Sequence, residues 1–154
     1  MALVSTILAA CGSDGTIPDA GRGEAQITLH ASQPPASSNI VGVTVRNTGT
    51  VPLEMGGCPT ALEQRAGANW VFAGSNPNGC DRSLRVIGVG QSIELVASPW
   101  VQTSGTYRFR YDSLRDGGSL DASSQLPLAN RVSTAFALVC VPSVAGTCSV
   151  NFNP

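Results

Sequence analysis

The sequence predicts an all-β fold of the sandwich or barrel kind, and three observations support this prediction. Apolar and polar residues alternate in several short runs, which is the period of a half-buried strand. Turn-forming residues separate these runs, and the 154 residues include 17 Gly and 10 Pro. No segment shows a clear apolar repeat of about 3.6 residues, which an amphipathic helix would require.

The expected strands follow from this alternation. The segment 41–46 is the clearest case, because valine occupies every second position from Val41 to Val45. The runs 61–65 and 70–72, joined by a Gly-containing loop at 66–69, predict a hairpin. Further strands are expected at 24–31, 52–55, 84–87, 92–96, 106–111 and 131–139. We therefore expect about seven to nine strands, with residues 150–154 either adding an edge strand or fraying.

Composition excludes some classes of partner. Hydrophobic residues make up 42% of the chain and charged residues 12%, and the formal net charge is −1. Such a chain lacks the basic footprint of a nucleic-acid binder and the polybasic stripe that attracts anionic lipids. A length of 154 residues suits a single domain with a core of its own. We expect no nucleic-acid partner.

The N-terminus carries a targeting motif. Residues 1–10 are uncharged and mostly apolar, and Cys11 follows them directly. The quartet Leu8-Ala9-Ala10-Cys11 resembles the lipobox of bacterial lipoproteins, in which the thiol receives a diacylglyceryl group and the chain is cut before the cysteine. The basic residues that usually precede the apolar stretch are missing, and a buried strand that ends in cysteine is the alternative interpretation. The resemblance implies a signal-peptide remnant at 1–10, a lipidated flexible tether at 11–23, and membrane attachment through lipid on Cys11.

The remaining cysteines fit an exported protein. Five cysteines occur, at positions 11, 58, 80, 140 and 148. With Cys11 assigned to lipid, the other four can form two disulfides in an oxidising compartment, in any of three pairings. We favour Cys58–Cys80 and Cys140–Cys148, because each pair brackets a turn-rich segment. Their spacing and the single histidine, His30, do not match a zinc site, so we expect no metal and no cofactor.

Three short motifs in the strand region resemble immunoglobulin-like domains of bacterial surface lipoproteins. They are the run Val43–Gly49 with its Asn-Thr-Gly end, a Gly-Gln turn before Ile93-Glu94-Leu95, and the run Gly105–Phe109. The resemblance covers about residues 24–139 and implies an immunoglobulin-like Greek-key sandwich within 24–154, followed by a C-terminal disulfide hairpin. It also implies that Tyr107 is a corner tyrosine whose hydroxyl bonds nearby backbone. A fainter similarity in the order of elements is to the proteinase-inhibitor sandwich family.

The motif search favours a non-catalytic protein. His30, the only histidine, falls at an outward position of the first expected strand. No nucleophile elbow, phosphate-binding loop or dinucleotide fingerprint is present. The carboxylates Asp112, Asp116 and Asp121 lack the alternate spacing of a calcium loop and are interpreted as solvated acids. We expect no enzymatic activity, although a hydrolase using His30 is a third hypothesis.

Two features are candidates for binding. The segment 112–130 is long for a connection, and long loops on a rigid sandwich often carry recognition; the alternative is a plain crossover. Trp100 would be an interface anchor if exposed and would plug one end of the sandwich if buried. Trp70 is expected in the core, and Arg46, Arg108 and Arg110 on a solvated face. Candidate binding residues are therefore Trp100, Arg115, Asp116, Leu120 and Asp121.

Together these features predict an envelope-anchored lipoprotein that faces the periplasm or the exterior of a bacterial cell. It would act as a non-catalytic binding or structural module with an envelope or extracellular protein partner. The alternative function is a protease inhibitor that presents the loop 74–80, braced by Cys58–Cys80.

Overall fold

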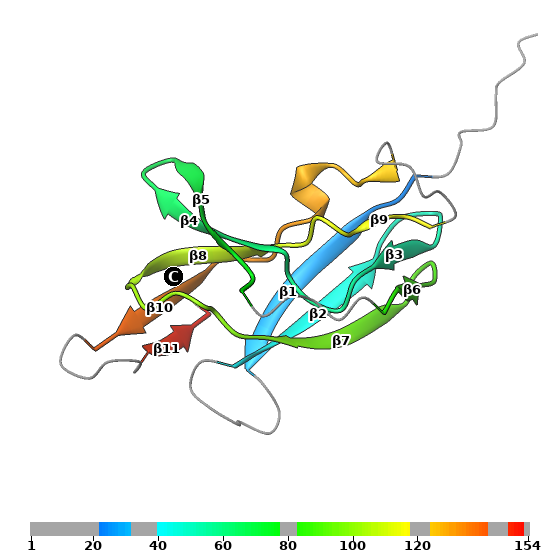
Figure 1. Ribbon diagram of the computed structural model, residues 1–154. Coiled ribbons are helices and arrows are strands. Elements are labelled where there is room, and N and C mark those ends of the chain that lie inside the picture. Colours follow the sequence, from blue (N-terminus) through cyan, green and yellow to red (C-terminus); the bar gives the residue numbers. More distant parts are fainter. Residues whose placement is uncertain (1–21, 32–39, 78–82, 118–123, 142–147, 153–154) are drawn as a thin grey trace, which may run out of the picture.

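The computed structural model describes residues 22–31, 40–77, 83–117, 124–141 and 148–152 (Figure 1). Its strands form three antiparallel sheets, and no α-helix occurs in these ranges. The prediction of an all-β fold is confirmed. Within the same ranges, no helix has the length and apolar character needed to cross a membrane.

Each sheet combines strands that are distant in the sequence. The first sheet has the order β1 (Ala25–Ala31), β2 (Val41–Asn47), β7 (Ser92–Ala97). The second has the order β11 (Cys148–Asn151), β10 (Phe136–Cys140), β8 (Gly105–Arg110), β4 (Ala61–Ala66), β5 (Asn69–Ser75). The third, small sheet has the order β6 (Arg85–Ile87), β3 (Leu53–Met55), β9 (Arg115–Asp116).

Two expected elements differ from the structure. The strand expected at 131–139 begins only at Phe136, because residues 131–134 cross between the two large sheets: Ser133 donates its N–H to Phe109 of β8, and Thr134 donates its N–H to Ile27 of β1. The connection expected at 112–130 contains the short strand β9 and the 3₁₀ turn Leu128–Asn130.

A single hydrophobic core joins the three sheets. In β2 and β8, for example, alternate residues are buried, as the period of two requires. The largest fully buried side chains are the aromatic residues Tyr107, Phe109, Tyr111 and Phe136. Phe109 and Phe136 stack with ring centroids 5.1 Å apart. The hydroxyl of Tyr107 donates to the carbonyl of Thr103 over 2.9 Å, so the hydrogen bond expected between this hydroxyl and nearby backbone is present.

Asn47 is a fully buried polar residue that ties three segments together. Its side-chain nitrogen donates to the carbonyls of Val51 over 2.8 Å and Ile87 over 3.0 Å. Its side-chain oxygen accepts the N–H of Gly49 over 3.0 Å. Its main chain is bonded to Gly90 and Gln91, on the turn before β7. Because a buried amide needs partners for each of its polar atoms, this geometry fixes the end of β2 against the turns on both sides.

One expected disulfide, Cys140–Cys148, is present and joins β10 to β11. Cys58 is also disulfide-bonded, and its expected partner Cys80 lies outside the described residues, as does Cys11. The bond between β10 and β11 fixes the outer edge of the five-stranded sheet on the side away from β5.

We expect Asn47→Ala to lower the free energy of unfolding by about 2–3 kcal/mol, because two carbonyls and one N–H in buried or partly buried positions lose their partner. Urea denaturation measures this change. Thr48→Ala is the matched control, since the neighbouring side chain is exposed. Equal stability of the two variants would contradict the role of Asn47.

Candidate interaction surface

The β4–β5 hairpin stands out from the rest of the five-stranded sheet (Figure 1). Ala66 pairs with Asn69, so the loop consists of Gly67 and Ala68 alone. Two-residue hairpin loops of one common type need a positive φ at their first position, and Gly67 has φ 63° there. The glycine therefore lets the chain reverse direction at this point, and β5 pairs back along β4.

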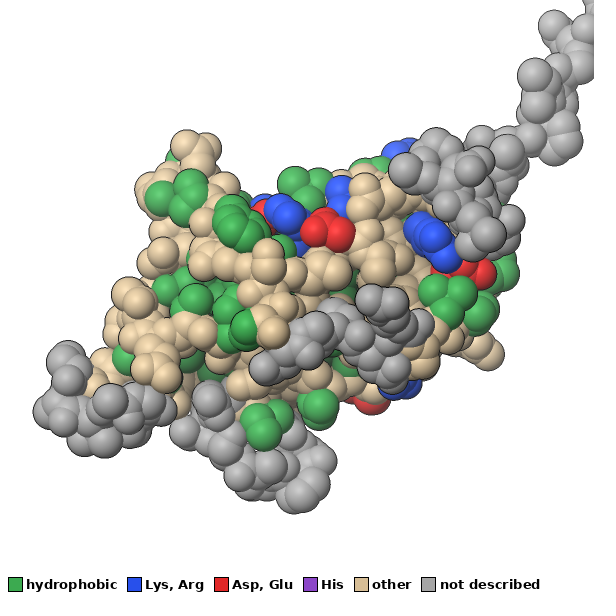
Figure 2. All heavy atoms as spheres, in the orientation of Figure 1, with side chains coloured by type: hydrophobic (Ala, Val, Ile, Leu, Met, Phe, Trp, Pro, Cys, Tyr) green, Lys and Arg blue, Asp and Glu red, His purple; other side chains and the backbone are tan. Residues whose placement is uncertain are grey.

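The outer strand β5 is apolar and open. Val71 is 45% exposed and Phe72 61% exposed, and no residue from Asn69 to Ser75 carries a charge. The five-stranded sheet ends at β5. Natural edge strands usually carry charged residues or proline that prevent pairing with other chains, and β5 has neither. Hydrophobic side chains gather on this hairpin at the surface (Figure 2).

Trp70 lies on the outer face of this sheet, and the prediction that it belongs to the core is wrong. It is paired across the hairpin with Arg65, and the guanidinium carbon of Arg108 lies 4.5 Å from the centre of its ring. A cation over an aromatic face is attractive, so Arg108 holds the indole against the sheet. The sequence did contain a signal: Trp70, Val71 and Phe72 are consecutive, and successive strand residues cannot all face one side.

A nearly buried carboxylate supports the hairpin from the adjacent strand. Glu63 of β4 has a side chain only 7% exposed, and it forms ion pairs with Arg108 over 2.7 Å and Arg110 over 2.8 Å. Both arginines come from β8, beside β4 in the sheet. Removing a carboxylate from water is unfavourable unless it is paired and hydrogen-bonded, so Glu63 fixes the register of β4 on β8.

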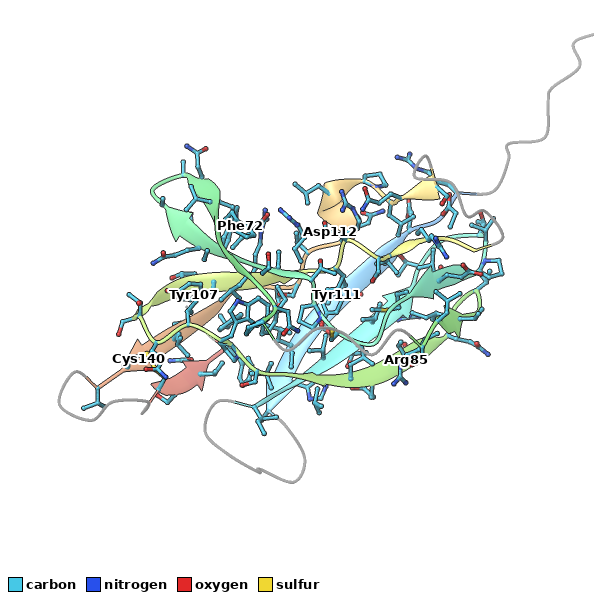
Figure 3. The ribbon with its side chains drawn as sticks, in the orientation of Figure 1. Phe72, Arg85, Tyr107, Tyr111, Asp112 and Cys140 are labelled. Carbon is cyan, nitrogen blue, oxygen red and sulfur yellow. A yellow bond between two sulfur atoms is a disulfide. The ribbon has the colours of Figure 1, made fainter. Side chains whose placement is uncertain are left out.

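The network continues to Asp112, at the end of β8. The Asp112 carboxylate forms ion pairs with Arg110 over 2.9 Å and Arg131 over 2.8 Å, and it accepts a hydrogen bond from the hydroxyl of Thr60 over 3.1 Å. Figure 3 labels Asp112 above the middle of the sheet, between the hairpin and the 3₁₀ turn. Arg108, Arg110 and Asp112 are therefore paired groups, not the solvated charges that the sequence predicted.

The structure places the predicted loop residues in supporting positions. Arg115 is ion-paired with Glu54 of β3 over 3.2 Å, and Asp116 follows it in β9. Trp100 is half-buried and packs on Phe109 with ring centroids 6.1 Å apart, which matches the buried alternative. Leu120 and Asp121 lie outside the described residues, as do residues 78–80 of the proposed inhibitor loop.

His30 occupies the expected outward position on β1. Its Nε2 lies 2.9 Å from a carboxylate oxygen of Glu94 and its Nδ1 lies 3.0 Å from the carbonyl of Ala31. The ring lies directly over Gly42, where a Cβ would collide with it. The hydrogen bond to Ala31 and then the contact with Glu94 raise the pKa of His30 above its ordinary 6.5. The Nε2 contact thus links β1 to β7 across β2, while the Nδ1 contact stays within β1.

An open hollow of about 270 Å³ lies beside this cluster, and Gly57, Arg85, Glu94, Leu95 and Val96 line it. Thr44 donates its hydroxyl to Glu94 over 2.7 Å, and this bond is the main cause that lowers the pKa of Glu94. In the described part of the chain, no three His, Cys, Asp or Glu residues lie close enough together to hold a metal ion.

Comparison with models of known protein families gave no match. A search of curated proteins likewise found no significantly similar sequence. The interpretation of this surface therefore rests on its own geometry.

We expect Glu63→Gln to lower the free energy of unfolding by about 3 kcal/mol, because it leaves Arg108 and Arg110 without their shared carboxylate in a nearly buried position. Chemical denaturation measures the loss. Glu24→Gln, at an exposed position, is the control and should change stability by less than about 0.5 kcal/mol. A loss of similar size in both variants would contradict the structural role of Glu63.

We expect stability to fall slightly as the pH rises past the pKa of His30. Because folding raises this pKa above 6.5, the stabilisation is complete below 6.5 and is lost as the pH rises through the folded value. The pair is largely exposed, with side chains 46% and 61% accessible, so the effect should stay below about 0.5 kcal/mol.

An NMR titration of this single histidine, compared with that of the unfolded chain, measures the shift directly. Denaturation between about pH 5 and pH 9 tests its consequence, and His30→Gln should remove the step near neutrality. An unshifted pKa, or an unchanged step in the variant, would contradict this assignment.

Proposed function

We propose that this chain is a lipid-anchored protein of a bacterial envelope, and that its immunoglobulin-like sandwich is a non-catalytic interaction module. The observation that carries the proposal is the open, uncharged strand β5 with its exposed aromatic residue Phe72. Aromatic side chains are enriched at protein interfaces, where they bury a large area at a small cost in conformational entropy.

The strand order supports the immunoglobulin-like part of the proposal. In such sandwiches one sheet contains the first, second and fifth strands of the pattern. The other sheet contains the seventh, sixth and third strands, in that order. Variable-type domains add one more strand beside the third. The orders β1-β2-β7 and β10-β8-β4-β5 agree with this pattern, with β11 as an additional strand beside β10. The hydroxyl of Tyr107, in the strand equivalent to the sixth, makes the backbone hydrogen bond typical of the tyrosine corner.

The position of the hairpin agrees with an anchor at the N-terminus. The beginning of β1 and the tip of the β4–β5 hairpin lie at opposite ends of the molecule in Figure 1. Ten residues separate Cys11 from Arg22 and can span at most about 35 Å. An acylated Cys11 would keep the start of β1 within about 35 Å of the membrane surface, at the end of the molecule opposite the hairpin.

The lipid anchor has a direct test in the native host. We expect the mature chain to begin at Cys11 with a diacylglyceryl group and to occur in the membrane fraction, because residues 8–11 form the processing motif. Mass spectrometry of the N-terminal peptide measures this, and Cys11→Ser should release the protein from the membrane. Unprocessed chains that retain residues 1–10 and a free thiol at Cys11 would contradict the anchor.

The interaction role is tested by crosslinking in intact cells with a reagent that joins nearby proteins. We expect the native chain to give defined adducts and Phe72→Lys to lose them, since a charge at an edge strand opposes pairing. Val96→Lys is the matched control, because Val96 is 66% exposed on another strand. Adducts that persist in Phe72→Lys, or disappear in both variants, would contradict a role for the hairpin.

A further inference from the structure

We infer that the partner of β5 is a second copy of this chain, which adds its own β5 antiparallel to the first and joins two five-stranded sheets into one. This inference rests on the proposed function, because it names the partner of the same hairpin. It draws on four properties of β5: its free hydrogen-bonding groups, its alternation of side chains, its lack of charge and its position at the edge.

The first step concerns which main-chain groups are free. In a hairpin with a two-residue loop, the residues that close the loop exchange both main-chain hydrogen bonds, and the pattern then alternates along the strand. Ala66 and Asn69 close this loop, so Asn69 and Val71 direct their N–H and C=O groups toward β4. Trp70 and Phe72 direct theirs toward the open edge. An added strand can therefore form four hydrogen bonds with these two residues.

The second step concerns the register. A two-fold axis at Val71 places Trp70 of each copy opposite Phe72 of the other, and this pairing satisfies all four main-chain groups of Trp70 and Phe72. Trp70 and Phe72 lie on the same face of β5, opposite Arg65 and Glu63 of β4. Two aromatic pairs would then form side by side on one face, and aromatic cross-strand pairs are among the favourable ones. Arg108 already holds each indole against the sheet.

The third step concerns charge and access. No residue of β5 is charged, so the two-fold axis brings no like charges into contact. The nearest carboxylate on this face, Glu63, is already neutralised by Arg108 and Arg110. The order of residues around Val71 is symmetric in kind, because an aromatic residue stands on each side of it. The self-complementary order of Trp70, Val71 and Phe72 favours a second copy.

The interface is small, so the dimer should be weak. Three residues per strand bury less than the roughly 1,200 Å² of stable complexes, and we expect the dimer to dissociate on dilution. Attachment of both copies to one membrane would raise their effective concentration and favour the dimer.

The first experiment is sedimentation velocity of the full chain with Cys11→Ser, over concentrations up to about 1 mM. We expect a monomer–dimer equilibrium in the native sequence, its loss in Phe72→Lys and its retention in Val96→Lys. A monomer at every concentration, or equal loss in both variants, would overturn the inference. If the chain stays monomeric while Phe72→Lys still removes crosslinked adducts in cells, self-association fails and the proposed interaction role stands.

The second experiment fixes the register by disulfide trapping in the same Cys11→Ser background. At a two-fold axis, Val71→Cys would face its own copy in a pair that exchanges no hydrogen bonds, with Cα atoms about 4.5 Å apart, which suits a disulfide. Asn69→Cys is the matched control on the same strand, since its two copies would lie about 13 Å apart along the strand. Under mild oxidation, we expect Val71→Cys to give a peptide crosslinked to its own copy and Asn69→Cys to give none. Equal trapping of both variants, or of neither, would overturn the proposed register.

Discussion

The carboxylate of Glu63 is the group on which the arrangement of this surface depends. It lies on the outer face of a sheet, yet its side chain is only 7% exposed, because Arg108 and Arg110 cover it. A charge in that position is tolerated only while both partners are in place, so β4 and β8 must meet in one register. That register sets where the β4–β5 hairpin leaves the sheet and places Arg108 over Trp70.

A second constraint acts at the other end of the molecule. Asn47 is fully buried, and its amide bonds to carbonyls of two different segments. The Asn47 interactions join the end of β2 to the turn before β7 and to the end of β6. The Glu63 network joins β4 to β8 and extends through Asp112 to Arg131, where the chain crosses between the two large sheets. Both constraints are polar groups with little exposure to solvent, where an unpaired donor or acceptor would cost about 1–3 kcal/mol. These paired polar groups allow only one register between neighbouring strands, whereas a hydrophobic core alone specifies the register less strictly.

Much of the fold could be predicted from the sequence, because period-two alternation reports which side of a strand is buried. It located β1, β2, β4, β7 and β8 closely. It failed at residues 131–135, where hydrogen bonds to Phe109 and Ile27 replace regular pairing, and no local pattern encodes such a crossing. The hydrogen bond of Tyr107 was predictable because the resemblance to immunoglobulin-like domains implied it.

The candidate surface was harder to predict. The sequence indicated a hairpin at 66–69, but which strand lies at the edge depends on the order of all strands in the sheet. Arg108, Arg110 and Asp112 looked like solvated charges because their partners Glu63 and Arg131 are distant in the sequence. Trp70 looked like a core residue because its large apolar surface suggests burial, whereas the cation that covers it comes from another strand.

The central claim is that β5 is an open edge whose free groups alternate and are satisfied by a second copy. Residue-resolved hydrogen exchange tests this claim most directly, by comparing dilute and concentrated samples of the same chain. The account predicts that the amides of Asn69 and Val71 are protected at every concentration, while those of Trp70 and Phe72 exchange quickly in dilute solution and become protected as concentration rises. Uniform protection along β5, or fast exchange at Trp70 and Phe72 that does not respond to concentration, would contradict the account.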